Sequence, residues 1–170
     1  ISASLLMFIY IMIYDRNLFK IKIKDTYLFV GTGIMSIVFF NWCYFIAMKE
    51  TSYSIAAILL YTAPAFVMIL SKISFNETIT VKKILSLFMT FGGCILITGL
   101  LGSKQAISFY GLIVGLGSGF GYALYSIFGK VALRKYDSIT ISFYSFLFAA
   151  IFLIPFGNSK IIAENIREVN

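Results

Sequence analysis

Residues 111–130, GLIVGLGSGFGYALYSIFGK, hold six glycines and end in Gly-Lys, a composition that suggests a phosphate-binding loop. The Walker A form of such a loop requires G-x-x-x-x-G-K followed by Ser or Thr. Here Val131 follows the Gly-Lys pair, and Leu124 stands where the first glycine belongs. A G-x-G-x-x-G motif that begins at Gly115 also fails, because Phe120 replaces its last glycine. The sequence therefore argues against a nucleotide site here.

The same stretch reads well as a helix with two unlike faces. At 100° per residue, one face of the helix is apolar and the other carries small and hydroxyl-bearing residues. The glycines of the second face follow a small-x-x-x-small pattern, which lets helix backbones approach closely in a membrane. For them we favour helix packing, whereas hydroxyls on this face are candidates for a substrate cavity. The packing glycines are Gly111, Gly115 and Gly119, and the cavity candidates are Ser118, Tyr122 and Ser126.

Four other polar or helix-breaking positions fall inside apolar segments. Pro64 stands near the centre of SYSIAAILLYTAPAFVMILS and predicts a kink, because proline cannot bond the carbonyl of the preceding turn. Broken helices at the midplane are common at transporter binding sites, but a kink can also be purely architectural, and both readings stay open. Tyr61 beside the kink and Asn41 in the preceding segment are further cavity candidates, and Gly93 permits close packing or bending.

Residues for metal or nucleophilic chemistry are scarce. The chain has no histidine, and its two cysteines, Cys43 and Cys94, stand alone in apolar segments. We therefore expect no metal site, no cofactor and no enzymatic activity. All acids lie in or beside the polar gaps; the acid nearest to a functional role is Glu77, for which an ion pair with a neighbouring lysine is the plainer explanation.

Composition points to the bilayer as the solvent of these elements. Of the 170 residues, 60% are hydrophobic and 12% are charged, and the mean hydropathy is +0.94. A soluble domain keeps about a quarter of its residues charged. The net charge of +7 does not favour nucleic acid, since the basic residues fall in short gaps between apolar runs. The sequence predicts an all-α, multi-pass membrane helix bundle.

Apolar runs of suitable length predict one truncated span and five complete ones. They are Ile1–Tyr14 (truncated), Tyr27–Met48, Ser52–Ser71, Ile84–Leu101, Phe109–Phe128 and Ile139–Phe156. Basic residues number 4, 1, 3, 1, 3 and 2 in the successive gaps and the tail, which places ten on one side and four on the other. Because basic loops stay in the cytoplasm, we expect loops 15–25, 72–83 and 129–137 on the cytoplasmic side of the cell membrane.

The middle of the chain resembles the EamA domain of the drug/metabolite transporter superfamily. The matching positions are Ala47-Met48, Thr51-Ser52, Ala56, Ala57, Pro64, Glu77, Thr80 and Gly93, although Ser86 replaces another glycine that is usual in the family. The resemblance implies a ten-helix protein of two inverted five-helix repeats, with residues 1–101 ending the first repeat and residues 109–170 beginning the second. On this basis the chain begins inside the second helix of the whole protein.

The resemblance further implies a secondary transporter, or permease, for a small metabolite or drug-like solute. Its partners would be that solute and membrane lipid, without nucleic acid, and a homodimer is an assembly that the sequence leaves open. A membrane-embedded enzyme and a scaffold subunit without transport activity remain alternatives. The sequence identifies neither the substrate nor a coupling ion.

Overall fold

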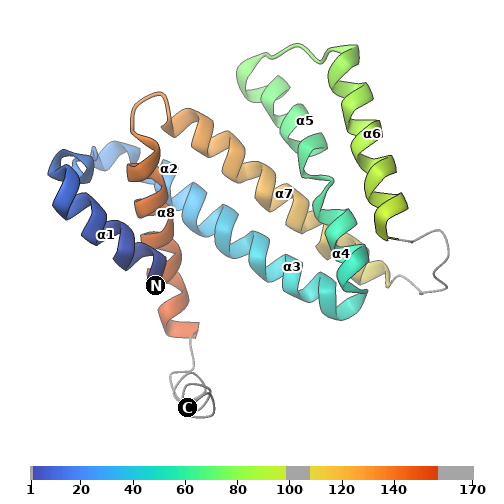
Figure 1. Ribbon diagram of the computed structural model, residues 1–170, viewed down its shortest axis with the longest axis horizontal. Coiled ribbons are helices and arrows are strands. Elements are labelled where there is room, and N and C mark those ends of the chain that lie inside the picture. Colours follow the sequence, from blue (N-terminus) through green and yellow to red (C-terminus); the bar gives the residue numbers. More distant parts are fainter. Residues whose placement is uncertain (1, 99–107, 157–170) are drawn as a thin grey trace.

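The computed structural model describes residues 2–98 and 108–156, and within these ranges the chain is helical without a strand. Figure 1 shows the path of the chain. The α-helices are α1 (Ser2–Tyr14), α2 (Thr26–Val30), α3 (Phe39–Glu50), α4 (Tyr53–Leu60), α5 (Ala63–Phe75), α6 (Val81–Thr98), α7 (Phe109–Ala132) and α8 (Ser138–Leu153). The end of the fourth predicted span, most of the gap at 102–108 and the basic residues of the tail lie outside the described residues.

Three helical stretches are long and apolar enough to cross a membrane by length and composition: Ile23–Glu50, Tyr53–Phe75 and Phe109–Ala132. Two shorter apolar helices, Ala3–Tyr14 and Ser138–Leu153, accompany them. The helices begin and end within a few residues of the predicted spans, because both are set by where the apolar runs stop. The all-α membrane bundle is thus confirmed, while the count of five complete spans stays a prediction.

The first long stretch contains a wide π-helical segment, η3 (Gly31–Val38), between α2 and α3. The Ser36 hydroxyl donates to the carbonyl of Gly31, five residues earlier, at 2.9 Å. Small residues bring this segment against α8: a methyl group on Gly33 would lie 2.6 Å from the backbone oxygen of Ser145. The hydroxyls of Thr32 and Ser145 also lie 2.5 Å apart. Contact between η3 and α8 therefore depends on a glycine and on small hydroxyl-bearing residues, as in other membrane helix pairs.

The second long stretch is broken near its middle, as the proline predicts. Helix α4 ends at Leu60 and α5 begins at Ala63, with Pro64 in the first turn of α5. Proline suits a first turn because its missing N–H would be unpaired there. The break itself lies at Tyr61 and Thr62, on the N-terminal side of the proline. The hydroxyl of Thr62 donates to the carbonyl of Leu59 at 2.6 Å and so satisfies a backbone group at the break.

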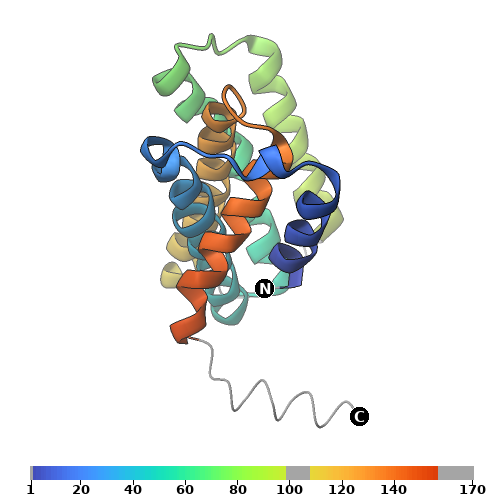
Figure 2. The same ribbon diagram turned by 90° about the vertical axis from the view of Figure 1, so that its left-hand side faces the viewer.

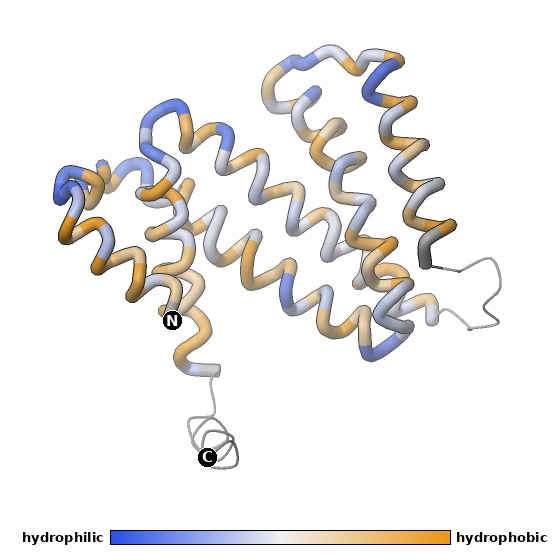
Figure 3. The backbone as a smooth tube through the Cα atoms, viewed as in Figure 1, coloured by the Kyte–Doolittle hydropathy of each residue, from blue (hydrophilic) through white to orange (hydrophobic). Residues whose placement is uncertain are grey.

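Helix α7 is the centre of the bundle. It contacts α3, α4 and α5. In Figure 1, α6 lies beyond α5 at one end of the molecule and α1 lies at the other end, which faces the viewer in Figure 2. Figure 3 shows hydrophobic residues along all the helices and hydrophilic residues concentrated in the turns. Large apolar side chains are widely exposed, with Trp42 66% and Phe88 71% accessible. Such a surface requires a non-aqueous environment, as the composition predicts.

Candidate functional site

A groove of about 740 Å³ opens between α5, α6 and α7. One end is charged and the remainder mixes hydroxyls with apolar side chains. This is the usual make-up of a small-molecule site, in which a few polar groups orient a ligand against apolar walls. The residues that line it are Ala63, Pro64, Val67, Met68, Ser71, Glu77, Lys82, Lys83, Ser86, Leu87, Thr90, Tyr122, Ser126, Ile127 and Lys130.

The charged end of the groove is organised around Glu77. Its carboxylate accepts from Lys83 at 3.3 Å and also pairs with Lys130, which reaches across from α7. The ammonium groups of Lys130 and Lys83 lower the pKa of Glu77 below its ordinary value. The ion pair between Glu77 and a neighbouring lysine, which the sequence suggested, is present with Lys83. The second partner, Lys130, comes from a distant helix. The pairing connects the α5–α6 turn to the end of α7.

The turn that carries Glu77 leaves α5 through Asn76, whose φ of 53° is left-handed. Asparagine is one of the few residues with a side chain that readily adopts this conformation at the end of a helix. The chain therefore reverses at once, and Glu77 comes to lie beside the last turns of α7. Lys130 also lies 4.6 Å from the ring centre of Phe75, a cation–π contact that holds its side chain at this end of the groove.

The wall of the groove beside Pro64 depends on the glycine face of α7. A methyl group on Gly111 would lie 2.5 Å from the Thr51 side chain, and one on Gly115 would overlap Leu59. Gly111 thus meets the turn before α4, while Gly115 meets the second long stretch itself. A methyl group on Gly119 would lie 2.5 Å from the hydroxyl of Thr62, at the break itself. The absence of side chains on α7 lets the broken helix lie directly against it.

The structure brings two of the predicted cavity residues to the groove. Tyr122 and Ser126 lie one turn apart on α7 and line the groove together with Pro64. The ring of Tyr122 also packs edge-on against Phe40, at 5.8 Å between centroids, so its position is fixed from the side of α3. These hydroxyls lie between the charged end and the broken helix.

The other predicted residues lie elsewhere. Ser118 is buried and donates to the carbonyl of Gly115 at 2.6 Å, while Asn41 donates to the carbonyl of Ile37 at 2.7 Å. The Ser118 hydroxyl and the Asn41 side-chain amide thus each donate to a backbone carbonyl of the preceding turn. Tyr61 is 48% exposed and does not line the groove. A methyl group on Gly93 would meet no heavy atom within 4 Å, so Gly93 makes no close helix contact with the described residues.

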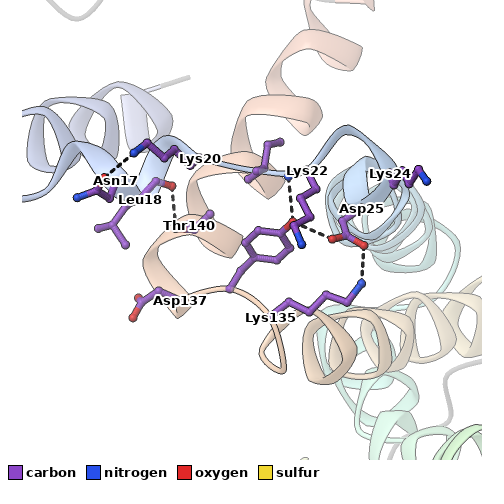
Figure 4. Close-up of a pocket in the computed structure, with 11 residues that line it drawn as sticks. Asn17, Leu18, Lys20, Lys22, Lys24, Asp25, Lys135, Asp137 and Thr140 are labelled. Carbon is purple, nitrogen blue, oxygen red and sulfur yellow. Dashed lines mark hydrogen bonds and ion pairs between the residues drawn. The ribbon is translucent and has the colours of Figure 1, made fainter.

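A second cavity of about 740 Å³ lies where the α1–α2 loop meets the α7–α8 turn (Figure 4). Its lining includes the buried carboxylate of Asp25, which accepts from Lys135 at 2.6 Å and from the Tyr136 hydroxyl at 2.8 Å. The bond to Asp25 raises the pKa of Lys135. The sequence placed Asp25 only at the end of a polar gap. Its local signal was weak, because it is one of two acids in a basic loop and its partners lie about 110 residues away.

The described residues contain no group of three or more Asp, Glu or Cys side chains that could hold a metal ion. The two carboxylates with unusual surroundings, Asp25 and Glu77, are each engaged by lysine from the end of α7 or the turn after it. Both pairs therefore join loops that the charge pattern assigns to one side of the membrane. All three of those loops lie at the same end of the helices, toward the top of Figure 1.

Comparison with known proteins finds relatives that are named as transporters. At 29% identity over 81% of the chain, an uncharacterized transporter of Archaeoglobus fulgidus is similar to it, with 48% of that relative covered. A second A. fulgidus transporter is 32% identical over 66% of the chain and 39% of its own length. The uncharacterized transporter YyaM of Bacillus subtilis is 27% identical over 85% of the chain and 48% of its own length.

The chain thus spans about half the length of the curated relatives it matches, or less. No solved structure matches it. A family model does, over residues 1–99 and again over residues 109–168, which together include nearly the whole sequence. The chain belongs to the EamA-like transporter family.

Proposed function

We infer that the protein is a secondary transporter that moves a small metabolite or drug-like solute across the cytoplasmic membrane by alternating access. The groove between α5, α6 and α7 would form part of the solute path. The observation that carries this proposal is the position of Tyr122 and Ser126, which face the broken helix at Pro64 from the neighbouring α7. A break in a membrane helix frees backbone groups for a solute in a place where hydrocarbon offers none.

The two ends of the groove support a path rather than a closed pocket. Glu77 and three lysines stand at one end, next to a turn, while Tyr122 lies further along α7 toward the middle of the bundle. A solute would pass from charged groups, through hydroxyls, to the break. In the complete transporter, two inverted repeats would supply the remaining walls, with residues 1–101 in the first repeat and 109–170 in the second. Loops 15–25, 72–83 and 129–137 would face the cytoplasm.

The test is uptake into proteoliposomes that contain the purified protein, against a broad panel of metabolites and drug-like solutes. For any solute that is moved, Ser126→Trp should strongly reduce the rate, because an indole at this position fills the groove. Ile113→Trp places the same bulk on a 52% exposed position of α7 outside the groove and should leave the rate unchanged. Equal rates for the two variants would contradict the assignment of the groove, and no uptake by folded protein would contradict transport itself.

A further inference from the structure

The cavity at the α1–α2 loop is a preformed structure. The loop is fastened to the start of α8 by two side chains, since Thr140 donates to the carbonyl of Leu18 at 2.9 Å and Tyr144 to that of Phe19 at 2.8 Å. Further along, the N–H of Lys22 donates to the Tyr136 hydroxyl at 3.0 Å. These bonds fix the loop backbone and therefore the positions of the Cα atoms of the loop lysines. A ligand would therefore not have to order the loop when it binds.

The lining carries an excess of positive charge that the cavity itself does not neutralise. Four lysines line it against two acids, Asp25 and Asp137. Asp25 is engaged by Lys135 and Tyr136, and Asp137 caps α8 by accepting from the N–H of Ile139 at 2.9 Å. The three lysines that remain make no ion pair among the described residues. They are Lys20, Lys22 and Lys24.

The three lysines follow one another along one short loop (Figure 4). Lys20 donates to the neutral amide oxygen of Asn17 at 2.9 Å, and Lys22 lies between it and the Asp25–Lys135 pair. The Lys20 and Lys24 side chains point away from Lys22 (Figure 4), but lysine has a flexible four-carbon stem, so an anion beside Lys22 can draw their ammonium groups toward it. A phosphate group suits such a site, because it offers several strong acceptor oxygens and a full negative charge.

The surroundings of the cavity indicate where such a phosphate comes from. Exposed apolar side chains accompany the basic loop. Ile13 at the end of α1 is 77% exposed, and Ile23, between Lys22 and Lys24 in the sequence, is 91% exposed. A phospholipid presents acyl chains beside its phosphate in the same way. The loop is also one that the charge pattern places on the cytoplasmic side, where anionic headgroups attract basic segments next to the membrane.

We propose that the cavity between the α1–α2 loop and the α7–α8 turn binds the phosphate of an anionic phospholipid headgroup through Lys20 and Lys22, with Lys24 at its edge. The lipid would fasten the first repeat to the second beside the Asp25–Lys135 pair. This site is separate from the solute groove and does not depend on its assignment.

The test compares retention of phosphatidylglycerol and of zwitterionic phosphatidylcholine by the purified protein in native mass spectrometry. The wild type should retain phosphatidylglycerol preferentially. The double variant K20Q/K22Q should weaken that retention by about tenfold or more, since each lysine near the headgroup contributes to binding. K20R/K22R should keep it, which separates loss of charge from loss of fold. The matched control K49Q/K72Q removes two exposed lysines outside the cavity and should retain the lipid as the wild type does.

A second arm adds inorganic phosphate at millimolar concentration. If phosphate leaves the lipid bound, the glycerol and acyl chains contribute to recognition, as the apolar flanks predict. Displacement of the lipid would show that the site recognises phosphate from any carrier. That result would support the lysine site and overturn the assignment to lipid. Unchanged retention by K20Q/K22Q, or equal loss in K49Q/K72Q, would overturn the proposal altogether.

Discussion

The contact between Gly119 and the break in the second long stretch yields a quantitative prediction. A methyl group on Gly119 would lie 2.5 Å from the Thr62 hydroxyl, 3.1 Å from the carbonyl oxygen of Leu59 and 3.2 Å from the nitrogen of Ala63. Ordinary van der Waals contact of such a methyl group begins at 3.4 Å, so all three distances are too short. Two of the three neighbours are backbone atoms, which cannot turn aside, so Gly119→Ala must push α7 away from the break.

The magnitude follows from comparison with a second glycine of the same helix. A methyl group on Gly129 would meet no heavy atom within 4 Å. Both substitutions gain about 1 kcal/mol of helix propensity, which cancels between them. What remains is the overpacking at Gly119, for which about 1–3 kcal/mol is typical. Gly119→Ala should therefore be less stable than Gly129→Ala by that amount.

The assay is the unfolding of both variants in the same mild detergent. At roughly 2–4 °C per kcal/mol for a chain of this size, the Tm of Gly119→Ala should lie about 2–12 °C below that of Gly129→Ala. Gly92→Ala is a second control, because a methyl group there also meets no atom within 4 Å. Equal Tm values for all three variants would refute the close packing of α7 on the broken helix.

The remaining predictions concern the loops. Because lysines lower the pKa of Glu77 from its ordinary value of 4.5, its ion pairs stabilise the fold above that pH and are lost as the pH falls through the lowered pKa. The Tm advantage of the wild type over Glu77→Gln should therefore be full at neutral pH and shrink on acidification below about pH 4.5; a constant difference would contradict this. Tyr136→Phe removes the acceptor of the Lys22 N–H, so hydrogen exchange of that amide should accelerate. An unchanged rate would show that this bond does not hold the loop. Single cysteines at Asn76 and Lys49 should react with an impermeant reagent from opposite sides of the membrane, and labelling from one side would contradict the topology.

Tyr144→Phe is the matched control for the exchange measurement. It removes a hydroxyl that bonds the same loop, but at the carbonyl of Phe19 and not at the N–H of Lys22. Exchange at Lys22 should therefore rise more in Tyr136→Phe than in Tyr144→Phe. An equal rise in both would mean that the loop opens as a unit and that the individual bond has no local effect.

Much of the fold was predictable because the bilayer imposes a length on each apolar run. The turns fell where charge interrupts those runs, and Pro64 marked the long stretch that breaks. The position of the break was not predictable to the residue, because Leu59, Thr62 and Ala63 at the break pack against Gly119 of a distant helix. The glycine spacing on α7 identified which face would be small, but the element that occupies that face appears only in the packing.

The site was harder to predict from the sequence than the fold. A hydroxyl in an apolar run can either bond the backbone of its own helix or line a cavity. Ser118 and Ser126 are two turns apart on α7, yet the first bonds its own helix and the second lines the groove. Nothing in the local sequence separates them. Asp25 illustrates a different limit: its lysine and tyrosine partners stand on another loop, and only the tertiary structure joins them.

The claim that the groove between α5, α6 and α7 is the solute path is tested most directly by chemical accessibility in the membrane. In a variant that lacks Cys43 and Cys94, single cysteines are placed at Ser126 and at Ser118 and exposed to a small water-soluble thiol reagent during uptake. Ser126→Cys should react and lose transport, and a transported solute should slow the reaction, whereas the buried Ser118→Cys should stay unmodified. Equal inertness of the two cysteines, or labelling of Ser126→Cys without loss of transport, would contradict the assignment of the groove.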